Sequence, residues 1–115
     1  MGRDCLFCKI AAGEIPCQKV FEDEWVVAFK DIEPQAPHHI LLIPRRHIPT
    51  TLDLAASDQA LLGRLFQTAN QLARQLGFAD EGFRIVNNCN DFGGQVIGHL
   101  HFHLLAGRRM GWPPG

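Results

Sequence analysis

The decapeptide GHLHFHLLAG, residues 98–107, alternates three histidines with apolar side chains. A period of two residues is typical of a β-strand, in which successive side chains point to opposite faces. We therefore expect His99, His101 and His103 on one face, with the leucines and phenylalanine between them on the other. This stretch predicts a strand that has one polar, functional face and one face packed on the core.

The spacing of the three histidines limits how they can share a metal ion. At a rise of about 3.3 Å per residue, the backbones of His99 and His103 lie about 13 Å apart. Zinc–nitrogen bonds are about 2 Å long, so two neighbouring histidines converge on an ion more easily than all three. We expect the outer two histidines to have different roles. The alternative, three histidines that are merely packed or solvated, stays open at this point.

The flanking sequence predicts four further strands and two helices. Strands are expected over 19–22, 25–31, 39–44 and 83–88, and the apolar period of 57–76 predicts a long helix that ends before Gly77. A short helix near the N-terminus is closed by Gly13, whereas 89–98 and the tail 107–115 read as loops. Strands joined by short turns plus one long helix favour an α+β fold with an antiparallel sheet, in a single domain over 1–115.

Composition excludes several classes of protein. The chain has 115 residues, a formal net charge of -1 and 46% hydrophobic residues, which is an ordinary balance for one globular domain. Without a basic surplus we expect neither nucleic acid nor a membrane surface as a partner, and no apolar run approaches a membrane span. The first residues, MGRDCLFCKI, lack the apolar region of a secretory signal, so we expect a cytoplasmic protein.

In that compartment the four cysteines are expected as thiols or metal ligands rather than disulfides. Cys5 and Cys8 form a Cys-x-x-Cys pair, but a thioredoxin-like redox motif needs a βαβ context that is absent here. A structural zinc site would need two more ligands. The pair could instead be helix residues half packed in the core. Cys17 and Cys89 have no partner at metal spacing and are expected as free thiols.

The run HLHFHLL resembles the motif of the histidine triad (HIT) superfamily, in which three histidines alternate with hydrophobic residues. The segments FEDEWVVAFKDIEPQAPHHILLIPRRHI, GFRIVNN, GGQ and GWPPG resemble the Hint branch of that superfamily, the nucleoside phosphoramidases. The resemblance implies a five-stranded antiparallel sheet with one long helix and a short N-terminal helix. It also implies a homodimer in which the sheets join and the tail carries Trp112 towards the partner protomer's site. There, Trp112 would help to shape the substrate-binding site.

The resemblance assigns catalytic roles to three histidines. The middle triad position, His101, would attack the α-phosphorus of a purine nucleoside 5′-phosphoramidate, and water would then hydrolyse the nucleotidyl-histidine. His103 would contact the phosphate, and His39 would complete the polar cluster. His38, on the opposite strand face, is expected at the surface. Protonation of the leaving amine is open between His39 and His103, and no organic cofactor is implied.

The same resemblance implies the substrate-binding residues. Asp31 and Ile32 correspond to the contacts to ribose and base, and Asn88 to the phosphate-site asparagine. Gly94 corresponds to a glycine that lets backbone amides approach an anion. Val96 stands where some relatives have serine, so a hydroxyl donor is lost there. The purine preference is inherited from the resemblance alone.

Members of the wider superfamily that carry the N-terminal Cys-x-x-Cys pair use it with two histidines. Those positions are His47 and His99 here, and together with Cys5 and Cys8 they would form a closed Cys2His2 zinc site of structural type. Such a site would fasten the N-terminal helix to the sheet and leave His99 without a catalytic role.

Three other functions compete with the phosphoramidase. A dinucleoside polyphosphate hydrolase of the fragile-histidine-triad branch would use the same nucleophile with a different leaving-group pocket. A nucleotide-binding or scaffold protein would bind AMP with negligible turnover. A pure metal-binding module would use His101 as a ligand and lose all activity with its metal.

Overall fold

A computed structural model describes residues 5–115, so the first four residues of the expected domain, 1–115, lie outside the described residues. Ten elements follow one another along the chain: α1 (Leu6–Ala11), β1 (Lys19–Glu22), β2 (Val26–Lys30), β3 (His38–Pro44), the 3-10 helices η2 (Thr51–Asp53) and η3 (Ala56–Asp58), α2 (Gln59–Leu76), β4 (Arg84–Asn87), α3 (Asn90–Gly93) and β5 (Phe102–Ala106).

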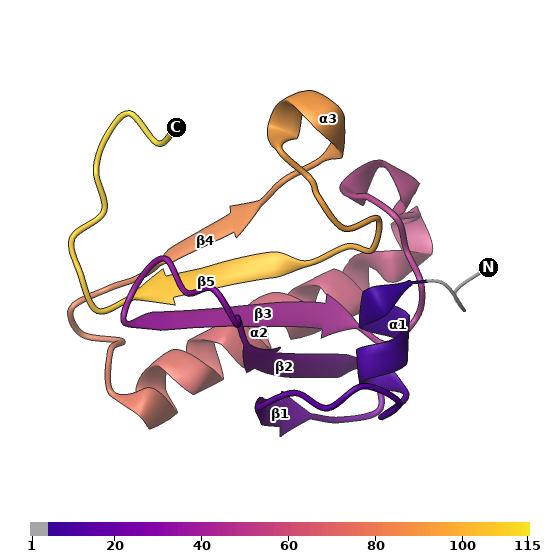
Figure 1. The fold of residues 1–115 in the computed structure, drawn as a ribbon, viewed down its shortest axis with the longest axis horizontal. Coiled ribbons are helices and arrows are strands. Elements are labelled where there is room, and N and C mark those ends of the chain that lie inside the picture. The colour runs from indigo at the N-terminus through magenta and orange to yellow at the C-terminus, as the bar shows by residue number, and fades with distance from the viewer. Residues whose placement is uncertain (1–4) are drawn as a thin grey trace.

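The five strands form one antiparallel sheet in the order β1-β2-β3-β5-β4. The long helix α2 lies across one face of this sheet, and α1 lies at the opposite face near the ends of β2 and β3 (Figure 1). The predicted α+β fold, with a five-stranded antiparallel sheet and one long helix, is confirmed.

Helix α2 forms because its apolar residues recur every three or four positions and face the sheet. It ends at Gly77, which adopts the left-handed conformation and donates its N–H to the carbonyl of Ala73. The buried residues of the helix are Leu61, Leu65, Thr68, Ala69, Leu72 and Ala73.

Alternation along the strands divides the core between the two faces of the sheet. On the α2 face lie the buried apolar residues between and after the triad histidines, as the sequence predicted: Leu100, Phe102, Leu104 and Ala106. The other face carries a smaller apolar cluster, which packs against α1: Phe7, Ile10, Ala11, Val27, Phe29, Leu41 and Ile43. The triad histidines also lie on this second face, where His99 and His101 contact Phe7 of α1.

Most sequence-based boundaries differ from the structure by one or two residues, and two segments differ more. Strand β5 begins only at Phe102, because the N–H of His99 donates to the carbonyl of Ile97 and that of Leu100 to Ile48 instead of joining the ladder. The segment expected as a loop over 89–98 contains the short helix α3, which ends at Gly94 in the left-handed conformation. Local turns thus replace regular strand pairing just before the triad.

Helix α1 has six residues, too few to be stable alone, and tertiary contacts hold it. Its residues Phe7, Ile10 and Ala11 are buried. The guanidinium of Arg45 donates to the carbonyls of Ala11 and Asp23, which ties the end of α1 to the turn between β1 and β2. Among the described residues, no helix is long and apolar enough to cross a membrane.

Candidate functional site

The triad histidines divide between two clusters. His99 is fully buried and lies with Cys5, Cys8 and His47. His103 lies with His39 and Asp31 in a second cluster. The structure therefore brings the four expected metal ligands together in one group and two of the three expected catalytic histidines together in another.

In the first cluster, four potential ligand atoms converge. The Sγ of Cys5 is 3.2 Å from Nδ1 of His99, and the Sγ of Cys8 is 3.2 Å from Nδ1 of His47 and 3.4 Å from that of His99. The two Nδ1 atoms are 3.3 Å apart. A tetrahedral zinc ion with bonds of about 2.0–2.3 Å separates its ligand atoms by about 3.3–3.8 Å. The four side chains could therefore bind a metal ion with only small adjustments.

The protonation of His99 fits a ligand role. Its Nε2 lies 2.9 Å from the carbonyl oxygen of Pro44, which can only accept, so Nε2 carries the proton. Nδ1 then presents a lone pair to the sulfurs, as in metal sites where a backbone carbonyl fixes the other ring nitrogen. Burial and the neighbouring Cys5 raise the pKa of Cys8 to about 11. Two thiolates side by side are thus costly unless a cation lies between them.

The second cluster is also compact. His39 and His103 are diagonal neighbours on β3 and β5, since His39 pairs with Leu105 and His103 with Leu41. Nε2 of His39 is 2.9 Å from Nδ1 of His103 and 3.4 Å from the Oδ2 of Asp31.

Backbone contacts determine where the protons of the second cluster lie. The amide N–H of Gln35 donates to Nδ1 of His39, so the proton of a neutral His39 must be on Nε2. That N–H then donates to Nδ1 of His103, whose own proton is left on Nε2. A metal ion at Nε2 of His39 would have to displace this proton. The cluster is therefore suited to hydrogen bonding and proton transfer rather than to metal binding.

Burial lowers the pKa of both histidines in this cluster. For His39 burial outweighs the opposing effect of the Asp31 carboxylate. For His103 burial, His101 and His39 lower the pKa to about 4, although Asp31 raises it. Both imidazoles are neutral near pH 7 in the protein alone.

His101 lies between the two clusters, buried beneath the ring edge of Phe7. Its Nδ1 is 2.7 Å from the carbonyl oxygen of His99, which fixes the proton on Nδ1 and leaves a lone pair on Nε2. Its ring centroid is 5.1 Å from that of His103. The acceptor that holds the middle histidine, which the sequence did not reveal, is thus the backbone of the first histidine.

The other expected site residues differ in burial and in the contacts they make. Asp31 is half-buried and accepts the N–H of Glu33, whereas Ile32 is 95% exposed. Asn88 is half-buried, and Gly94 has a φ of +84°, which favours glycine. Separately, Val96 is 90% exposed and Trp112 82% exposed. His38 was expected at the surface, but it is half-buried because its ring lies 4.8 Å from that of Phe78.

Sequence reasoning missed three residues that position the site. The amide of Asn87 donates to the carbonyl of His101. The amide of Gln95 donates to the carbonyls of Pro49 and Ile97 and accepts the N–H of Asn90, which fastens the glycine-rich loop. The third is Gln35, whose backbone amide sets the tautomer of His39. Only its position next to Asn88, an expected site residue, could have pointed to Asn87 from the sequence.

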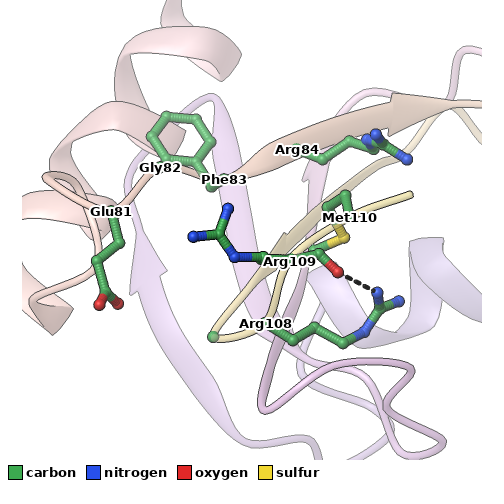
Figure 2. Close-up of a pocket in the computed structure, with 8 residues that line it drawn as sticks. Glu81, Gly82, Phe83, Arg84, Arg108, Arg109 and Met110 are labelled. Atoms are coloured by element: carbon green, nitrogen blue, oxygen red, sulfur yellow. Dashed lines mark hydrogen bonds between the residues drawn. The ribbon is translucent and has the colours of Figure 1, made fainter. Parts of the chain in front are cut away.

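A cavity of about 660 Å³ lies away from the histidines, between the start of β4 and the turn after β5 (Figure 2). Its lining includes Glu81, Arg84, Arg108 and Arg109. The guanidiniums of Arg84 and Arg108 donate to the backbone carbonyls of Gly111 and Arg109. None of the expected site residues lines this cavity.

Residues 12–110 match the family model of the HIT domain. The purine nucleoside phosphoramidase of Escherichia coli strain K12 is 46% identical over 111 residues, which cover 96% of this chain and 93% of that protein. An uncharacterized HIT-like protein of Synechococcus elongatus is 49% identical over the whole length of both chains.

Solved structures agree with these sequence matches. A HIT family hydrolase from Legionella pneumophila has a TM-score of 0.95 and 52% identity, covering 96% of this chain and 99% of that one. A histidine triad protein from Clostridium difficile has a TM-score of 0.93 and 44% identity, covering 95% of both chains.

Proposed function

This chain is a hydrolase of the HIT domain family, and from that premise we propose that it hydrolyses the P–N bond of purine nucleoside 5′-phosphoramidates. The products are a nucleoside monophosphate and an amine. The tautomer of His101 supports this proposal most: its Nδ1–H donates to the carbonyl of His99, and its Nε2 lone pair is free. A ring nitrogen that carries a lone pair is a competent nucleophile.

In the first step, the Nε2 lone pair of His101 forms a bond to the α-phosphorus while the bond from phosphorus to the amine breaks. The electrons of the broken bond go to the amine nitrogen, which takes up a proton and leaves. In the second step, a water oxygen attacks the phosphorus and the electron pair of the N–P bond returns to Nε2. The nucleotide keeps the hydroxyl of the water.

We assign the proton donation to His103. Because the N–H of His39 donates to Nδ1 of His103, the Nε2–H of His103 is the free donor of the pair. A bound phosphate anion raises the pKa of a neighbouring imidazole, so His103 takes up a proton on Nδ1 as the substrate binds. The Nε2–H of His39 then turns from His103 to Oδ2 of Asp31, which lies 3.4 Å from that nitrogen. The imidazolium gives its Nε2 proton to the amine, and the attacking water restores it. Before the substrate binds, the N–H of His39 keeps the ring of His103 in orientation.

The nucleotide is bound by residues around these histidines. The carboxylate of Asp31 accepts the ribose hydroxyls, and the exposed side chain of Ile32 packs on the base. The amide of Asn88 and the backbone N–H groups at Gly94 and Val96 contact the phosphate. Because Val96 has no hydroxyl, its contribution to the phosphate is limited to the backbone.

The Cys5, Cys8, His47 and His99 cluster holds a structural zinc ion in this proposal. A zinc ion held by these four residues would neutralise the two thiolates, and its role would be structural. The ligand-atom separations of 3.2–3.4 Å and the proton of His99 on Nε2 support a tetrahedral ion.

We also propose that the chain acts as a cytoplasmic homodimer. Strand β4 is at an edge of the sheet, so a second copy can approach its outer side, next to the arginine-lined cavity. Trp112 is well exposed, as a side chain that reaches a partner protomer would be. The four cysteines are unpaired, which suits a reducing compartment. Light scattering on the purified chain measures the mass and tests the dimer.

The function is tested by AMP release from adenosine 5′-phosphoramidate and from diadenosine tetraphosphate, with the native protein and the His101→Ala variant. We expect fast turnover of the phosphoramidate, slow turnover of the polyphosphate and a loss of at least about 10³-fold in the variant, since the covalent route is removed. The zinc content of the variant should equal that of the native protein.

Other outcomes redirect the assignment. Preference for diadenosine tetraphosphate would make the chain a polyphosphate hydrolase. AMP binding without turnover of either substrate would make it a nucleotide-binding module. Loss of zinc in His101→Ala would make that histidine a metal ligand and contradict its role as nucleophile.

A further inference from the structure

We propose that the Cys5, Cys8, His47 and His99 cluster is a positioning device for the nucleophile, and that Phe7 is the positioning residue which transmits its effect to His101. This inference rests on the proposed function, because it concerns the same histidine and the same reaction. It assigns to the metal centre a role in catalysis that involves no contact between the metal and the substrate.

The first connection is His99, which takes part in both halves of the site. Its Nδ1 faces Cys5, Cys8 and His47, whereas its backbone carbonyl accepts the Nδ1–H of His101 at 2.7 Å. A shift of His99 towards or away from the cysteines therefore moves the acceptor that fixes the tautomer of His101. With that acceptor lost, the proton can move to Nε2 and block the attacking lone pair.

The second connection is Phe7, which lies between the two cysteines in sequence. Its ring is edge-on to His101 at 5.1 Å and 82° between planes, and to His99 at 6.0 Å and 75°. Phe29 supports the same ring at 5.6 Å. Only 4% of Phe7 is exposed. This ring forms one wall against which the imidazole of His101 is held.

The position of Phe7 depends on how α1 is attached to the sheet. A helix of six residues has too few internal hydrogen bonds to set its own position. It is attached by Cys5 and Cys8 at one end, by the Arg45 guanidinium on the Ala11 carbonyl at the other, and by apolar packing between them. Metal binding by both cysteines fixes the end of α1 nearest to Phe7.

The test compares Phe7→Leu, which keeps all four ligands, with Phe78→Leu as a matched control. Phe78 is equally buried, at 3% exposed, and also stacks on a histidine, but on His38 and on the other face of the sheet. Both variants are measured with zinc bound, for kcat and KM on adenosine 5′-phosphoramidate. The ring ¹⁵N chemical shifts of His101, recorded at one fixed pH, report its tautomer.

We expect kcat of Phe7→Leu to fall about ten- to a hundredfold with little change in KM, because misplacing a reacting group by about 1 Å has that effect. The ¹⁵N shifts should show a mixture of tautomers at His101. Phe78→Leu should keep kcat within about twofold and the native tautomer, since its ring does not contact the triad. Equal kcat values and an unchanged tautomer in Phe7→Leu would overturn the inference.

Zinc removal provides a second measurement that does not depend on turnover. Chelation of zinc from the native protein should change the ¹⁵N shifts of His101, and zinc addition should restore them. In Cys8→Ser the addition should restore nothing. Identical His101 shifts with and without zinc would overturn the inference. If the zinc-free chain unfolds, as circular dichroism would show, the Phe7→Leu comparison decides.

The two proposals fail separately. If the native protein turns over neither test substrate, the proposed function fails, and the His101 shifts alone decide whether the cluster positions that ring. If turnover is as expected but Phe7→Leu behaves like Phe78→Leu, the positioning role fails and the phosphoramidase assignment stands.

Discussion

The two clusters on the α1 face hold similar side chains, but their protons lie in different places. In the cysteine cluster, formed by Cys5, Cys8, His47 and His99, the N–H of His99 points away from the group to the Pro44 carbonyl. The other ring nitrogen of His99 presents a lone pair to the group. In the Asp31 cluster, formed by Asp31, His39 and His103, the ring of His39 accepts a hydrogen bond from the backbone N–H of Gln35. Its own N–H therefore points into the group. One set of donor atoms is thus prepared for a cation and the other for proton transfer.

The difference arises from the backbone rather than from the side chains. A carbonyl beside an imidazole nitrogen requires a proton there, and an amide N–H requires a lone pair. Ligand-atom proximity alone would count both clusters as metal sites. The neighbouring backbone groups separate them. The same reasoning applies to His101, where the carbonyl of His99 decides which ring nitrogen carries the lone pair.

The largest expected effect comes from breaking the cysteine cluster. Cys8→Ser should lose tight zinc binding and melt about 10–15 °C lower, because α1 loses its attachment and a buried ligand set is left incomplete. Metal analysis and a thermal melt measure both quantities. Cys17→Ser, another half-buried cysteine, should keep its zinc and its melting temperature. If Cys8→Ser retained its zinc, the proposal that this cluster binds zinc would be wrong.

A pair of histidine variants separates the two clusters. His39→Ala should lower kcat about 10²-fold at native zinc content, since His103 loses the partner that orients its ring. His47→Ala should lower the zinc affinity and stability instead. The native chain should bind one zinc ion per chain, measured by titration. A second tight site abolished by His39→Ala would contradict the proton positions assigned to the Asp31 cluster.

The Asp31 cluster should also make stability depend on pH. Unfolded histidine takes up a proton near pH 6.5, whereas His103 in the folded chain does so only at about 4. Between these values the unfolded chain binds more protons, so the free energy of unfolding falls as the pH is lowered from 6.5 towards 4. His103→Gln should show a weaker decline in denaturant titrations at constant zinc. Equal slopes for the two proteins would contradict the lowered pKa.

The smallest expected effect concerns the support of His101. Asn87→Ala removes the hydrogen bond to the His101 carbonyl and should cost about 1 kcal/mol of unfolding free energy. We expect a decrease in kcat of about threefold, smaller than for Phe7→Leu, because the ring of His101 keeps its other contacts. Asn70→Ala, on the exposed side of α2, is the control and should match the native protein in both measurements.

Much of the architecture follows from local patterns in the chain. Helix α2 and the strands could be predicted from the sequence because burial of one face selects apolar residues at a fixed spacing. Helix α3 and the start of β5 at Phe102 could not be predicted from the sequence. They depend on the Asn90 N–H donating to the side-chain oxygen of Gln95 and on the Leu100 N–H donating to the carbonyl of Ile48, which is distant in sequence.

By itself, the sequence determined the residues available for chemistry: three alternating histidines, a Cys-x-x-Cys pair and a polar segment around His39. Only the tertiary structure decided how they divide into clusters and which nitrogen of each histidine carries the proton. The physical reason is that a tautomer is set by the nearest hydrogen-bonding group, and those groups come from elsewhere in the chain. Pro44 lies 55 residues from His99, and no spacing rule connects them.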